Sequence, residues 1–295
     1  MMTKQHSLIS LMIGISFFFF YSCNTCNRPE KVNNVTIEID LSELDADSIY
    51  LKIGQKVLLA LPTPIEASML IKDWGVPNVS VMNDPANVSS YLTKKKMALN
   101  FGVYVTDMTT AGIHGQTQTV LLYKQTMLQL IEGLGLKSVI DPAILQKIDD
   151  NINNKGELLN IITDIYSTCT EFLSEDDRDF LALAMLSGGW VEGMYIATNM
   201  IDEKDASNLD KMKKIINENK LTFDLLWHAL GNYEVIPPDA LQLMVDMSYV
   251  AHLFGHKTVI DNLPQSADNI NNITPKFFAD LKSHIHQLRH EIVKK

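Results

Sequence analysis

The sequence predicts an all-α fold, a multi-helix and mostly antiparallel bundle with two central apolar helices. Apolar residues recur at helical spacing from Tyr50 to the end of the chain. Glycine and proline are sparse, with 14 and 10 among 295 residues, which disfavours a turn-rich β-sandwich. The segments between the periodic runs are mostly short, and short connections favour antiparallel neighbours.

Residues 1–22 are predicted to be a lipoprotein signal peptide. Residues 8–21 form an uncharged run of 14 that includes four consecutive phenylalanines. This run is shorter than the roughly 20 residues that span a bilayer, and it suits the core of a signal peptide. Ser22-Cys23 after this run resembles a bacterial lipobox, although aromatic residues stand where Leu is commoner. The resemblance implies cleavage before Cys23 and a diacylglycerol on its sulfur; a plain secretory signal or an anchor helix is the alternative.

Residues 23–47 are predicted to be a flexible polar tether, and residues 48–295 a single all-helical domain. Residues 35–40 alternate apolar and polar side chains, as in one short strand. Asn24 rather than Asp follows Cys23, so inner-membrane retention is not indicated. The expected location is therefore the outer membrane, lipid-anchored and facing the periplasm. Cys26 and Cys169 could pair in an oxidising compartment, but Cys169 falls on an apolar stripe, which favours a buried free thiol.

Helical periodicity predicts about ten helices in the domain. The clearest covers residues 157–173, where eight apolar residues form one stripe and Asn154 supplies the N-cap. Similar start signals precede three further helices: Ser174-x-x-Asp177, Ser207-x-x-Asp210 and Thr274-Pro275. The run that follows Ser174 covers residues 180–200. The remaining predicted helices cover residues 64–74, 89–112, 117–134, 142–151, 222–231 and 238–253.

Two of these helices lack a polar face. Residues 98–108 and 181–197 are apolar nearly all round, which places both at the centre of the bundle. Gly188, Gly189 and Gly193 lie within the second one. Because a glycine inside a helix costs roughly 1 kcal/mol against alanine, three of them indicate close approach of another helix.

Each central helix carries an acid and a tyrosine three residues apart: Tyr104 with Asp107, and Glu192 with Tyr195. Side chains at this spacing are neighbours on a helix. One hypothesis is a polar site between the two helices, in which Asp107 and Glu192 bind a cationic or hydroxylated ligand. The other is a structural network in which hydroxyls and carboxylates satisfy one another or bind free N–H groups.

Other chemistry has little support in the sequence. His252 and His256 have i, i+4 spacing, but the pair lacks the adjacent Glu of a zinc protease helix, so no metal is expected. Nucleophile elbows, phosphate loops and dinucleotide fingerprints are absent, and neither catalytic residues nor a cofactor are expected. A formal net charge of −10 argues against nucleic acid as a partner.

Three segments, Leu61–Glu66, Ala98–Tyr104 with Asp107, and Gly188–Tyr195, together resemble a family of uncharacterised all-α lipoproteins of Gram-negative bacteria. The resemblance extends from about residue 55 to residue 235. It implies the helical fold and the envelope location, and it implies no activity.

These observations favour a membrane-anchored lipoprotein of the cell envelope with a non-enzymatic binding or scaffolding role. Its expected partners are the membrane, through the lipid on Cys23, and an envelope protein. The alternative is a small-ligand carrier or an enzyme with a polar site between the two central helices.

Overall fold

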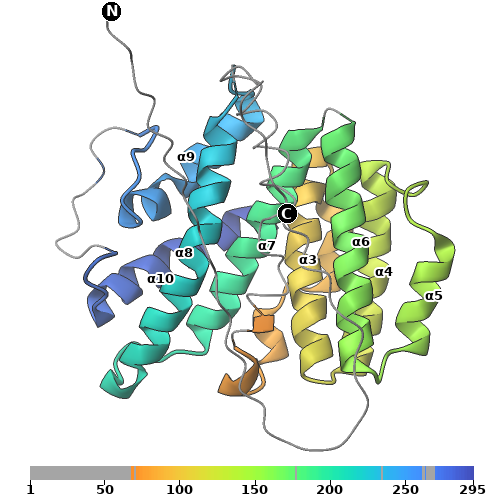
Figure 1. Ribbon diagram of the computed structural model, residues 1–295, viewed down its shortest axis with the longest axis horizontal. Helices are drawn as coiled ribbons and strands as arrows, with labels where there is room; N and C mark the ends of the chain where they lie inside the picture. Colours follow the sequence, from red (N-terminus) through yellow and green to blue (C-terminus); the bar gives the residue numbers. More distant parts are fainter. Residues whose placement is uncertain (1–67, 70, 177, 234, 261–262, 264–269) are drawn as a thin grey trace, which may run out of the picture. The chain divides into compact units, whose positions relative to one another are not determined.

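The structure is a computed structural model that describes residues 68–69, 71–176, 178–233, 235–260, 263 and 270–295. The expected signal peptide (1–22), the tether (23–47), Cys23 and Cys26 lie outside the described residues. The described part is all-α, as predicted, and contains no strand. Its α-helices (Figure 1) are α3 Lys94–Ile113, α4 Thr117–Leu134, α5 Pro142–Asp150, α6 Lys155–Glu175, α7 Asp179–Asn199, α8 Leu209–Gly231, α9 Pro238–Leu253 and α10 Pro275–Val293.

Capping side chains fix several helix starts where the sequence indicates them. The Asn154 carboxamide oxygen accepts a hydrogen bond from the backbone N–H of Glu157 at the start of α6. The Thr274 hydroxyl accepts one from the N–H of Phe277 at the start of α10. Each cap satisfies an N–H that has no partner within its helix. The bounds of α4 and α9 are those predicted from periodicity.

Two other predicted start signals are wrong. Ser174 belongs to α6, and its hydroxyl donates to the Asp179 carboxylate at 2.7 Å without capping α7. Ser207 caps no helix, because the N-cap of α8 is Asn208, which makes no side-chain cap bond. The predicted helix 222–231 is the second half of α8, since neither Gly nor Pro interrupts residues 209–230.

The region before α3 also differs from the prediction. Helix α3 begins at Lys94, five residues later than expected, because Thr93 caps it and the preceding chain forms short 3₁₀ turns. Of the predicted helix 64–74, the described residues 68–69 are helical and residues 72–74 form the turn η1. The 3₁₀ segments are η1 Lys72–Trp74, η2 Val79–Val81, η3 Pro85–Ser90 and η4 Ala206–Asn208.

Helices α3 and α7 form the centre, and glycines allow their backbones to touch. A Cβ atom added to Gly188 would lie 1.9 Å from the carbonyl oxygen of Leu99, and one added to Gly102 would lie 1.9 Å from that of Met185. Both distances are far below van der Waals contact, so no side chain fits at either position. This confirms for Gly188 the close approach that the sequence predicts.

The two central helices run in the same direction where they touch, because Leu99 meets Gly188 and, further along both helices, Asp107 meets Glu192. Helices that follow one another along the chain are mostly antiparallel. α4 and α6 pack against α3, α6 and α8 pack against α7, and α10 contacts both central helices as well as α9. In Figure 1, α3 and α7 lie among these neighbours.

Helix α7 is long and apolar enough to cross a membrane by length and composition alone. Most of it is buried inside the protein, so its apolar character is explained by its central place in the core. Cys169 is a buried free thiol on α6, and burial raises its pKa to about 12.

Candidate functional site

The two acids of the central helices meet in the core. Asp107 on α3 and Glu192 on α7 are both fully buried, with no exposed side-chain surface. Their carboxyl groups lie within hydrogen-bonding reach of each other. The glycine contacts hold the two backbones close together. Asp107 follows Gly102 by five residues on α3, and Glu192 follows Gly188 by four residues on α7, so both acids lie about one turn after the contact.

Arg289 of α10 completes this cluster. Its Nε donates to Glu192 Oε2 at 3.0 Å and its Nη2 to Glu192 Oε1 at 3.2 Å, which is a bidentate pair. The same Nη2 lies 3.3 Å from the carbonyl oxygen of Val81. The guanidinium also lies over the ring of Tyr195, 4.6 Å from its centroid. Both oxygens of Glu192 are therefore occupied by Arg289.

Asp107 has a different environment. Its Oδ2 accepts a hydrogen bond from the backbone N–H of Asn83 at 3.0 Å, whereas its Oδ1 is buried with no donor among the described residues. Burial, followed by the negative charge of Glu192, raises the pKa of Asp107 well above its usual range. Burial also raises the pKa of Glu192, but the guanidinium of Arg289 acts in the opposite direction.

These contacts assign the protonation of the cluster. Two carboxyl groups so close together cannot both ionise beside one guanidinium without a large electrostatic cost. Glu192 holds the negative charge because Arg289 binds it. Asp107 is the neutral acid, and a proton on its Oδ1 donated to Glu192 gives that oxygen a partner. The cluster then has no net charge, which is the state that burial favours.

Neither tyrosine bonds to the acid on its own helix. The Tyr104 hydroxyl donates to the carbonyl of Asp84 at 2.9 Å, and burial raises its pKa. Tyr195 packs against Arg289 and against the ring of His286, whose centroid is 4.7 Å away. Of the four residues singled out in the sequence, Asp107 and Glu192 therefore meet directly, Tyr195 joins through Arg289, and Tyr104 binds the segment that covers Asp107.

That covering segment contains Asn83, whose groups are all engaged. Its backbone N–H binds Asp107, and its carbonyl accepts from the Tyr123 hydroxyl of α4 at 3.1 Å. Its side-chain nitrogen donates to Tyr91 and Asn100, and its side-chain oxygen accepts from Asn87. The buried acids are thus closed off by a fully bonded layer.

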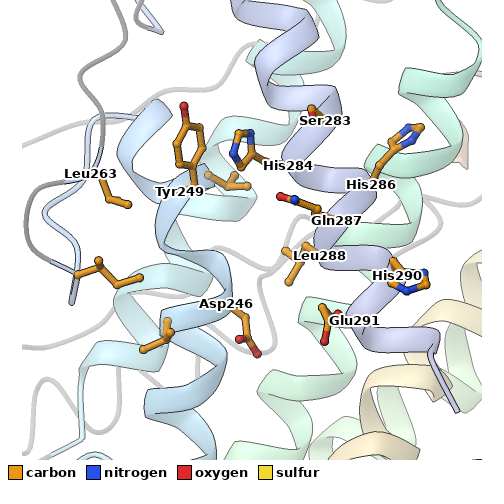
Figure 2. Close-up of a pocket in the computed structure, with 13 residues that line it drawn as sticks. Asp246, Tyr249, Leu263, Ser283, His284, His286, Gln287, Leu288, His290 and Glu291 are labelled. Atoms are coloured by element: carbon orange, nitrogen blue, oxygen red, sulfur yellow. The ribbon is translucent and has the colours of Figure 1, made fainter.

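A pocket of about 600 Å³ lies elsewhere, between α9 and α10 (Figure 2). Its size is in the range of small-molecule sites. Asp246 and Glu291 lie at one end, Gln287 near the middle, and Tyr249 and His284 at the other end. Its apolar lining is Val245, Val250, Ile260, Leu263 and Leu288.

Several polar groups of this pocket, called here the α9–α10 pocket, are not used by the fold. Among the described residues, the side chains of Ser283 and Gln287 make no hydrogen bond. The His284 ring stacks on Tyr249, with centroids 3.4 Å apart and planes 4° apart. His284 Nδ1 lies 2.7 Å from the carbonyl of Asp280, and a carbonyl only accepts, so Nδ1 carries a proton. In the neutral ring Nε2 then remains an acceptor.

Two other described histidines, His256 and His286, have polar partners in the fold, whereas Nε2 of His114 is buried without a hydrogen-bond partner among the described residues. His256 lies 2.7 Å from the carboxylate of Asp224, and His286 contacts the amide of Asn199. His114 lies at the end of α3, where burial lowers its pKa. In the part of the chain that the structure describes, no three His, Cys, Asp or Glu side chains form a group that could hold a metal ion.

Sequence reasoning missed Arg289, Asn83 and the α9–α10 pocket. One signal for Arg289 was present: the chain has only three arginines, and this one lies beside the apolar stripe of the last helix. Asn83 had no comparable signal, because its role depends on where an irregular segment crosses the core. Comparison with known proteins gives no match to any family model, curated protein or solved structure.

Proposed function

We propose that this chain is a lipid-anchored binding protein of the cell envelope, without enzymatic activity, whose α9–α10 pocket receives its ligand. The observation that carries the binding role is the set of polar groups in that pocket that the fold leaves without partners. Apolar walls with a few convergent hydrogen-bonding groups are typical of small-molecule sites. The ligand chemistry that suits this lining is an apolar or planar body with hydrogen-bonding groups.

The buried cluster gives no comparable support for catalysis. Glu192 is fully bound by Arg289, and Asp107 is bound by Asn83 and by the shared proton. A general acid or base must reach the proton that it transfers in a substrate. The covering layer of Asn83 and Tyr123 occupies the space around these carboxyl groups, which favours the structural network over the polar ligand site.

The binding role is tested with the full chain purified from its own envelope, by native mass spectrometry. We expect an added mass that denaturation removes and that Gln287→Leu weakens at least tenfold. Gln146→Leu is the matched control, because Gln146 is an exposed amide on α5, outside the pocket. An added mass that both variants retain equally, or a bare chain from every preparation, would contradict a ligand in this pocket.

The envelope location rests on the Ser22-Cys23 pattern and on the resemblance to lipoproteins of Gram-negative bacteria. Metabolic labelling with palmitate tests it directly in a Gram-negative host. We expect the full chain to incorporate the label and to sediment with the outer membrane, and Cys23→Ser to lose both properties. Cys26→Ser is the matched control and should retain them. Equal labelling of Cys23→Ser would disprove lipidation at this residue.

A further inference from the structure

The end of α10 is held to the core mainly by polar contacts that converge on the buried cluster. Arg289 binds Glu192 and the carbonyl of Val81. The Tyr91 hydroxyl donates to the carbonyl of Val293 at 3.1 Å, and the Asn100 amide donates to that of Ile292 at 3.0 Å.

Lys96 strengthens the same end of the helix. Its ammonium group donates to the carbonyl oxygens of Glu291 at 2.6 Å and Ile292 at 3.1 Å, which have no acceptor role within α10. Beyond Arg289, the only buried apolar side chain of α10 is Ile292. The last turn of α10 therefore depends on these bonds more than on apolar burial.

We propose that the proton shared by Asp107 and Glu192 is a latch that keeps the last turn of α10 and the segment around Asn83 closed over the core. Removal of the proton leaves two carboxylates facing one guanidinium in a dry interior. Such charges must be hydrated, because burial of an uncompensated charge costs several kcal/mol. Water reaches them only when part of the surrounding structure opens.

The structure indicates which part opens. The α3 and α7 backbones touch at Gly102 and Gly188, so the acids cannot separate by a small helix shift without losing that contact. The layers that cover them are held by individual hydrogen bonds of Asn83, Tyr91 and Arg289, so they can open when these bonds break while the α3–α7 contact stays intact.

The charged and titratable groups around Asp107 come from every element packed on it: Tyr104 on its own helix, Tyr123 of α4, Glu192 of α7, Arg289 of α10, and Asp84 and Tyr91 of the covering segment. Burial raises the pKa of the three tyrosines, so they stay neutral in the pH range of the test. Among these groups, only the carboxyl pair then exchanges a proton there. His286 lies against Tyr195 beside Arg289, and burial, followed by the charges of Lys282 and Arg289, lowers its pKa.

The direction of the pH effect follows from linkage. The closed state binds one proton more than the open state at every pH between the ordinary carboxyl range, near 4, and the raised pKa of Asp107. The opening constant therefore rises tenfold per pH unit in this window, which corresponds to about 1.4 kcal/mol per unit. The proton therefore stabilises the closed state fully at pH values below this window, and this stabilisation is lost as the pH rises through the raised pKa of Asp107.

Hydrogen exchange of the full chain between pH 5 and pH 8, corrected for intrinsic exchange rates, tests the latch. We expect protection of the amides of residues 289–293 to fall as the pH rises, by about tenfold per pH unit up to the raised pKa of Asp107, while those of 123–131 in α4 keep their protection. Asp107→Asn should abolish the slope, because a neutral amide donates to Glu192 and accepts from Asn83 without a titrating proton. Asp149→Asn, at the ion pair with Lys124, is the control and should keep the slope.

Infrared spectroscopy supplies a second readout that does not depend on the stability of the variant. We expect the wild-type protein to keep the carbonyl band of a protonated carboxylic acid at a pH above the ordinary carboxyl range, and Asp107→Asn to lack that band. A pH-independent protection of residues 289–293, an unchanged slope in Asp107→Asn, or absence of the acid band above the ordinary carboxyl range would each overturn the proposal.

Discussion

The helix pairs α3–α7 and α9–α10 differ in how closely they pack and in whether their polar side chains have partners. Between α3 and α7 the backbones touch at two glycines, and the two acids are fully buried, with Glu192 bound by Arg289 and Asp107 by the N–H of Asn83. Between α9 and α10 the side chains leave a pocket, and Ser283 and Gln287 in it have no hydrogen-bond partner among the described residues. The acids that stand out in the sequence therefore have partners within the fold. The side chains with unused hydrogen-bonding groups lie instead between α9 and α10, two helices that no sequence motif had singled out as a site.

The largest effect should come from Gly188→Val, which breaks the tight pair. A side chain at this position meets the carbonyl of Leu99, so α3 and α7 must separate along their contact. We expect a loss of more than about 5 kcal/mol in the free energy of unfolding, measured by urea denaturation. Gly156→Ala is the control, because its nearest atom would be 3.9 Å away, and it should stabilise α6 by up to about 1 kcal/mol. Equal stability of the two variants would contradict the backbone contact.

Arg289→Met should have the next largest effect. It leaves Glu192 buried without its cation, and removal of one partner of a buried pair costs about 3 to 5 kcal/mol. The measurement is again urea denaturation, near neutral pH. Lys137→Met breaks the exposed pair with Glu132 and should cost at most about 1 kcal/mol. If both variants lost the same small amount, the buried pair would have no special role in the core.

A smaller effect is expected at the other end of α10. Thr274→Ala removes the hydroxyl that caps the helix and should cost about 1 kcal/mol. Ser207→Ala is the matched control, because the same kind of residue there caps no helix, and it should change the melting temperature little. A larger loss in Ser207→Ala than in Thr274→Ala would reverse this assignment of caps.

The smallest effect should come from the α9–α10 pair. Ser283→Ala removes a hydroxyl that the fold does not use, and we expect a change within about 0.5 kcal/mol in the free energy of unfolding. Thermal unfolding without ligand is the measurement. A loss of 2 kcal/mol or more would show that this hydroxyl is part of the fold, and would weaken the contrast between the two helix pairs.

Much of the fold was predictable because helices are specified locally. Periodicity predicted the bounds of α4 and α9. The lack of a polar face on α7, together with its glycines, predicted that this helix lies at the centre of the bundle. Capping was less predictable. Ser174 and Thr274 look alike in sequence, but only Thr274 has an extended backbone and accepts the N–H of the residue three positions on, whereas Ser174 lies within α6.

The candidate site was predictable only in part. Asp107 and Glu192 were identified from their positions on apolar helices, where a charged group needs a partner. The hypotheses gave each acid the tyrosine three residues away, a free N–H group or a ligand as its partner. Asp107 does accept from a backbone N–H, that of Asn83, whereas Glu192 binds Arg289, and both partners come from distant segments. Such pairings depend on how helices cross, and the spacing of residues along one helix does not contain that information.

The parallel contact of α3 with α7 also has a consequence during synthesis. Thr106 and Gly189 are 83 residues apart, and Glu192 and Arg289 are 97 residues apart. Helix α3, which has no polar face, emerges from the ribosome long before its main partner, and the neutral cluster forms only after the last helix has been made. The nascent chain therefore carries α3 without α7 until residue 199 is made, and Glu192 without Arg289 until residue 289 is made, the condition in which a chaperone that delays collapse is most useful.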